Sequence, residues 1–134
     1  MSLFFPVQQA TLLIPSGPSD DPDRKHLFIL LTNPHGEPPK ALMVSISTIR
    51  DGKYYDNSCV LKAGEHDFIK RDSFVLYSRA RIEPAEKIMK GVECNEFIYK
   101  GIMNANSFQS ICDGLMKSHH ASPKVKKFFS DSVG

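Results

Sequence analysis

The sequence lacks the features that would place it in a membrane or outside the cell. No apolar run approaches the roughly 20 residues that a membrane-spanning helix needs. The opening MSLFFPVQQATLLIPSG carries no basic region and places Pro6 after two phenylalanines, so we expect no signal peptide. Only three cysteines occur, and they are widely spaced: Cys59, Cys94 and Cys112. Such an odd set is not a disulfide framework and indicates free thiols in a reducing compartment. We therefore expect a cytoplasmic protein.

Strong charge and internal repeats are also missing. The net charge is +2, and charged residues make up 24% of the chain, an ordinary share for a soluble domain. How the charge is distributed therefore matters more than its sum. The 134 residues, 41% of them hydrophobic, are enough for one domain with a core. We expect a single domain over residues 1–134, with a compact core at about 8–118 and a basic C-terminal helix or tail at 119–134.

Apolar runs separated by turn-rich segments predict short strands in the first half. QQATLLI is β-prone, and ALMVSIST has the composition of a strand. HLFILLT is a continuous apolar run between loops, which is typical of a strand buried on both faces. The intervening segments are dense in Pro, Gly, Ser and Asp, which favour turns. We expect strands at 8–14, 26–32 and 41–48, and loops at 15–25, 33–40 and 50–58.

The segment 73–83, SFVLYSRARIE, alternates most clearly. Successive side chains of a strand point to opposite faces. We expect the mostly apolar set to face inward, and the set with two arginines and a phenol to face outward. The expected inward set is Phe74, Leu76, Ser78, Ala80 and Ile82, and the outward set is Ser73, Val75, Tyr77, Arg79 and Arg81.

The rest of the chain predicts short helices. The segment 84–91 has Pro84 at a favoured helix start and Gly91 at its end. The segment 107–118 carries apolar side chains at helical spacing, with Ser107 as the expected N-cap. We expect a last strand at 96–101 and a basic helical piece or tail at 122–130. Strands followed by helices predict a small, β-rich α+β domain, whose sheet could close into a barrel.

Three stretches resemble the MazF/PemK-like toxin family: RKHLFILLTNP, LMVSIST and FIKRDSFVLYSRARIEPAEKIMKG. The likeness spans roughly residues 8–116 as a pattern of apolar blocks and turns. It implies a small SH3-like barrel with short appended helices, to which we add a C-terminal helix. It also implies a toxin that cuts single-stranded RNA without a metal, works as a homodimer and is restrained by an antitoxin. We expect no cofactor and no membrane partner.

Cutting RNA without a metal requires a base, an acid and cations that stabilise the charge on phosphorus. Histidine handles protons near neutral pH, and the planar guanidinium of arginine binds two phosphate oxygens at once. We expect His66, Arg79 and Thr48 to be catalytic. The expected substrate-binding residues are Tyr77, Arg81, Lys70, Ser73, Lys25 and His26. They can meet only if strand ends converge at one rim of a curled sheet.

Structural roles for the same side chains remain open. His66 can cap the turn at Gly64, and Arg79 and Arg81 can be solvated or salt-bridged on an outer strand face. Tyr77 can be a packing residue. A non-catalytic SH3-like barrel that binds a protein or a nucleic acid is therefore the alternative to a nuclease.

Other chemistries are less well supported by spacing. Cys59 and His66 could form a nucleophile–base pair, although no third, orienting residue stands out. The three cysteines and His66 could bind zinc, but no close cysteine pair exists. Near the C-terminus, Phe128 and Phe129 stand beside lysines. They could dock on nucleic acid, but the preferred interpretation is that they pack on the core.

Overall fold

The protein is described by a computed structural model that covers residues 4–17, 19–21 and 23–133. Residues 1–3, 18, 22 and 134 lie outside the described residues, although the expected start, first loop and C-terminal segment include them. The described residues form strands first and helices mostly later. The elements are β1 Ala10–Pro15, β2 Lys25–Leu30, β3 Lys40–Thr48, β4 Val60–Leu61, β5 Ser73–Pro84, α1 Ala85–Glu93, β6 Ile98–Ile102, α2 Ala105–Lys117 and α3 Pro123–Val133.

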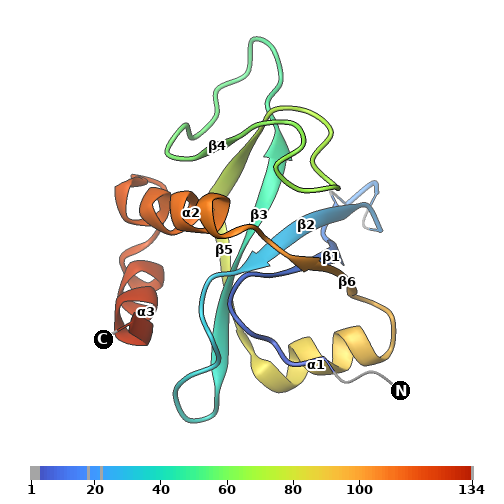
Figure 1. The fold of residues 1–134 in the computed structure, drawn as a ribbon, viewed down its shortest axis with the longest axis vertical. Helices are drawn as coiled ribbons and strands as arrows, with labels where there is room; N and C mark the ends of the chain where they lie inside the picture. The colour runs from blue at the N-terminus through green and yellow to red at the C-terminus, as the bar shows by residue number, and fades with distance from the viewer. Residues whose placement is uncertain (1–3, 18, 22, 134) are drawn as a thin grey trace.

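The strands form one antiparallel sheet in the order β4-β5-β3-β2-β1-β6, which curls into a half-barrel (Figure 1). This arrangement confirms the expected β-rich α+β class and the strands expected from the apolar runs. The short strand β4, paired with the start of β5, was not anticipated. Where β3 ends, its Thr48 pairs with Ser73 at the start of β5. Strand ends therefore do come together at one rim of the sheet.

Both faces of the sheet are buried, each against its own apolar cluster. On β2, Leu27 and Ile29 belong to one cluster, and Phe28 and Leu30 belong to the other. All four side chains are at most 3% exposed, which confirms the strand buried on both faces. Burying one such side chain stabilises the fold by roughly 1.5–3 kcal/mol. The larger cluster includes residues of α2 and α3, and the smaller one includes Ile88 of α1.

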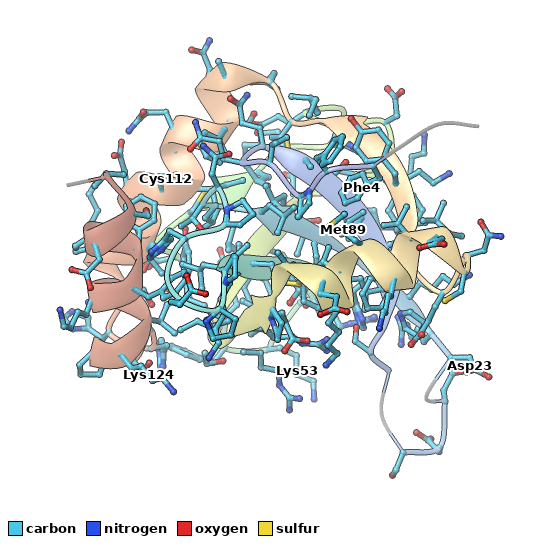
Figure 2. All side chains as sticks on the ribbon, turned by 90° about the horizontal axis from the view of Figure 1, so that it is seen from below. Phe4, Asp23, Lys53, Met89, Cys112 and Lys124 are labelled. Carbon is cyan, nitrogen blue, oxygen red and sulfur yellow. The ribbon has the colours of Figure 1, made fainter. Side chains whose placement is uncertain are left out.

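The helices cover the two faces of the sheet: α2 and α3 pack against the larger cluster, and α1 packs against the smaller one. Figure 2 shows α1, which carries Met89, crossing the strands, while α2 with Cys112 and α3 with Lys124 lie along another side. The loop that carries Asp23 extends away from the body in the same view. In the described part of the chain, no helix has both the length and the apolar character that crossing a membrane requires.

The expected faces of β5 are wrong over its first half. Ser73, Val75 and Tyr77 are buried, with Tyr77 only 1% exposed, although we expected them outside. The cause is a bulge in the pairing of β3 with β5. Met43 pairs with Arg81, but Ser45, two residues later on β3, pairs with Leu76, five residues earlier on β5. The three extra residues invert the alternation, because side chains change face with period two. Past the bulge, Ala80 and Ile82 pack on the larger cluster, as predicted.

Helix ends also differ from the sequence patterns. The helix α1 continues past Gly91, which packs inside it against Phe97. The N-cap of α2 is Asn104, whose side chain accepts a hydrogen bond from the backbone N–H of Ser107, so Ser107 is not the N-cap.

The C-terminal segment is a helix, α3. Its Phe128 and Phe129 pack on the larger cluster, which confirms the packing interpretation.

Candidate functional site

A groove of about 490 Å³ opens at the rim where β2 begins, β3 ends and β5 begins. The loops 49–59 and 62–72 stand at this end of the sheet, at the top of Figure 1. We call it the rim groove. Its lining residues are Arg24, Lys25, His26, Leu27, Ile46, Ser47, Thr48, Arg50, Phe68, Ile69, Lys70, Arg71 and Ser73.

A second groove, of about 470 Å³, adjoins the first and runs onto the sheet. We call it the sheet groove. The two grooves share His26 and Ser47. Within the sheet groove, the guanidinium carbon of Arg81 lies 4.8 Å from the ring centre of Phe28, a cation–π contact that orients the arginine. Its lining residues are Ser16, Gly17, His26, Phe28, Ser45, Ser47, Leu76, Arg79 and Arg81.

The two grooves together carry a strongly positive charge. Five lysines and arginines line the rim groove and two arginines line the sheet groove, while no Asp or Glu of the described residues lines either. The ion pairs among the described residues also lie elsewhere. They join Lys62 to Asp72, Lys87 to Glu83, Lys90 to Glu86 and Lys127 to Asp131. The groove cations are therefore left to attract an anionic ligand.

His26 stands where the two grooves meet. Its Nδ1 lies 2.8 Å from Ser16 Oγ, and the Ser16 hydroxyl donates to the carbonyl oxygen of Ile14. With the Ser16 hydroxyl donating to Ile14, the ring donates from Nδ1 and its Nε2 is left unprotonated. Burial lowers the pKa of His26 below its usual value, and the positive charge of Arg24 lowers it further. The ring is therefore held neutral near pH 7, in the form that accepts a proton.

His66 lines neither groove, and both of its ring nitrogens are engaged. Nδ1 accepts a hydrogen bond from the backbone N–H of Phe68 at 3.0 Å. Nε2 lies 3.1 Å from Thr11 Oγ1 and 3.0 Å from the carbonyl oxygen of Lys100. Since the Thr11 hydroxyl donates to the carbonyl oxygen of Gly101, Nε2–H is the donor to both of its partners. The geometry makes His66 a brace between the loop 62–72 and strands β1 and β6.

The side chain of Tyr77 is in the core, where its hydroxyl donates a 2.6 Å hydrogen bond to the carbonyl oxygen of Ile111. Its neighbour Cys59 is buried as well, and burial raises the pKa of that thiol to about 11. Such a thiol stays protonated near neutral pH and is a poor nucleophile. Because His66 bonds other groups, the Cys59–His66 pair has no support in the geometry. Among the described residues, no three His, Cys, Asp or Glu side chains gather where they could hold a metal ion.

The structure thus brings together most of the residues singled out in the sequence, but as two groups. Lys25, His26, Thr48, Lys70 and Ser73 line the rim groove. Arg79 and Arg81 line the sheet groove, which His26 joins to the first. His66 and Tyr77 line neither groove.

The lining residues that sequence reasoning missed include three arginines and one exposed aromatic residue: Arg24, Arg50, Arg71 and Phe68. A usable signal existed, because basic residues flank the ends of the expected strands. Arg24 precedes Lys25, and Arg71 follows Lys70. Phe68 stands two residues before Lys70, in a loop.

The comparisons with known proteins assign no family to this site. Neither a protein-family model nor a curated protein sequence matches the chain.

Proposed function

We propose that the chain is a MazF/PemK-like toxin that binds single-stranded RNA in the two grooves and cleaves it by metal-independent acid–base chemistry. The observation that carries this proposal is the arrangement of seven cationic side chains around one neutral histidine, with no carboxylate of the described residues in the lining. A phosphodiester chain is the common biological ligand that matches an extended row of cations. The curled sheet with its open rim supports the finer proposal of an SH3-like barrel.

In the proposed reaction, His26 is the proton carrier. Its Nε2 takes the proton of a 2′-hydroxyl, whose oxygen then attacks the neighbouring phosphorus. Arg79 and Arg81 donate hydrogen bonds to the phosphate oxygens as negative charge builds up on them. Thr48 and Ser73, on paired strand ends in the rim groove, add neutral donors. The protonated ring returns its proton to the leaving 5′-oxygen, so the products are a cyclic phosphate and a free 5′-hydroxyl.

The alternative is a barrel that binds nucleic acid without cutting it. One observation favours it: of the described residues, His26 is the only histidine that lines either groove. One ring must therefore serve as both base and acid. The binding role of the cations is the same in both cases, so only a cleavage assay separates the two functions.

The test is incubation of the purified protein with a short, unstructured RNA in excess EDTA. We expect cleavage that yields a 2′,3′-cyclic phosphate end. His26→Ala should abolish it, and Arg79→Ala should slow it roughly a hundredfold. Lys124→Ala, on α3 outside both grooves, is the matched charge control and should cut at the wild-type rate. Binding without cleavage by the wild type would make the protein a binder. The absence of both would reject the proposal.

The resemblance also leads us to propose a homodimer and an antitoxin partner. The support for the dimer is that β4 and β6 end the sheet and offer their outer edges for pairing. The support for an antitoxin is the charge of the grooves, which an acidic polypeptide could neutralise. Sedimentation velocity tests the dimer, and a strict monomer at high concentration would reject it.

A further inference from the structure

Phe68 is an exposed aromatic ring in a groove of cations. Its side chain is 44% exposed, whereas the other large apolar residues of the rim groove lining are buried or belong to the core. Phe68 belongs to neither apolar cluster. Packing therefore does not explain why a phenylalanine stands at this position, and leaving it in water has a free-energy cost.

The backbone around Phe68 is held in place. Its N–H donates to His66 Nδ1, and the N–H of Ile69 donates to the carbonyl oxygen of His66, which closes a turn. The carbonyl oxygen of Ile69 accepts from the N–H of Gly64, and the Ile69 side chain is only 4% exposed. His66 is itself bonded to Thr11 and to the backbone of β6. An exposed ring on an anchored turn loses little conformational entropy when it binds a flat partner.

Cationic side chains line the same groove as the ring. Lys70 and Arg71 follow it in the same loop, and Arg24 and Arg50 line the same groove from other loops. An aromatic platform beside a track of cations is the combination with which proteins hold a single strand of nucleic acid. The cations bind the backbone, and the ring stacks on a base.

We propose that Phe68 is the platform on which one unpaired nucleobase stacks, while the neighbouring cations hold the adjoining phosphates. This inference depends on the proposed function for the nature of the ligand, but not on cleavage. It also implies a selectivity, because a base inside a duplex is stacked on its neighbours and cannot reach the ring. Phe68 therefore makes the groove selective for single strands over duplexes.

The test compares oligonucleotides that share a backbone and differ in their bases. The probes are a short single-stranded 2′-O-methyl RNA, which cannot be cleaved through its 2′-oxygen, and an abasic chain of the same length. We expect wild type to bind the base-containing strand roughly tenfold more tightly than the abasic one. Phe68→Leu, which keeps an apolar side chain but lacks a π-face, should bind the two chains about equally. Lys70→Ala should weaken the binding of both chains by a similar factor, because it contacts phosphate.

A spectroscopic readout is available because the chain contains no tryptophan. In Phe68→Trp, the new indole is the only one in the protein. We expect the base-containing strand to quench its fluorescence and to bind as tightly as it binds wild type, while the abasic chain leaves the emission unchanged. Equal preference for the base-containing strand in wild type and Phe68→Leu, or no quenching, would overturn the stacking role while leaving the basic groove intact. If wild type binds neither chain, the proposed function fails and this inference fails with it.

Discussion

The Nε2 of His66 on the loop 62–72 lies 3.1 Å from Oγ1 of Thr11 on β1, a residue 55 positions earlier in the chain. Thr11 is fully buried, so this contact fixes the loop to a core position of β1. The same loop carries Phe68, Lys70 and Arg71, which form one wall of the rim groove. Through this contact the core sets the position of the groove wall.

The first prediction concerns that brace. His66→Ala removes the part-buried hydrogen bond to the Thr11 hydroxyl and the exposed hydrogen bonds to the backbone of Lys100 and Phe68. We expect a loss of roughly 1–3 kcal/mol in the free energy of unfolding, measured by urea denaturation. Thr11→Val, which keeps the side-chain shape but removes the hydroxyl, should show a loss of the same sign. A His66→Ala protein of wild-type stability that had lost all cleavage would instead make His66 catalytic.

The second prediction is the pH dependence of cleavage. Burial and the charge of Arg24 lower the pKa of His26, so the ring stays neutral, and able to accept a proton, to a lower pH than an ordinary histidine. The acidic limb of the cleavage rate should therefore have its midpoint below the usual value of about 6.5. Arg24→Gln removes the positive charge and should move that midpoint upward. A midpoint above the usual value in wild type, or one that Arg24→Gln moves downward, would contradict this account.

The third prediction concerns the contact between α2 and β5. A Cβ atom added at Gly114 would lie 2.4 Å from the hydroxyl oxygen of Tyr77 and 2.9 Å from the Cβ of Cys59. Gly114→Ala should therefore destabilise the fold by roughly 1–3 kcal/mol, although alanine favours helix by about 1 kcal/mol elsewhere. Ser110→Ala, at an exposed position of the same helix, is the control and should be neutral or slightly stabilising. Thermal unfolding measures both, and a Gly114→Ala protein more stable than wild type would rule out this packing.

The fourth prediction is that the thiols react in two classes. All three cysteines lie in the described part of the chain and are free, in line with the expectation from their number and spacing. Cys94 is exposed, whereas Cys59 and Cys112 are buried, and burial raises the pKa of Cys112 to about 12. A disulfide reagent at mildly alkaline pH should label one thiol quickly and two slowly, because the thiolate is the reacting form. In denaturant all three should react, and Cys94→Ser should remove the fast phase. Two fast thiols in the folded protein would disprove the burial of the cysteines.

The local sequence determined most of the secondary structure. The apolar runs around Leu27 and Val44 predicted strands, because both are short and lie between turn-rich segments. The Pro-rich connectors could not continue a strand or a helix, because proline lacks a backbone donor. A helix begins directly after Pro84, which is its N-cap, one residue later than predicted. Sequence also indicated Lys25, His26, Thr48 and Ser73 at strand ends, and Lys70 in the loop before β5.

Only the tertiary structure decided which way the residues of β5 face and which histidine lies in the grooves. The bulge between Leu76 and Arg81 follows from pairing with β3, so alternation within β5 alone could not reveal it. It turns Tyr77 into the core and leaves Arg79 with Arg81 in the sheet groove. His66 seemed the better candidate because it is close to β5 in sequence, yet long-range bonds to β1 and β6 engage its ring. Sequence proximity carries no information on such contacts, which exist only once the sheet has curled and brought distant strands together.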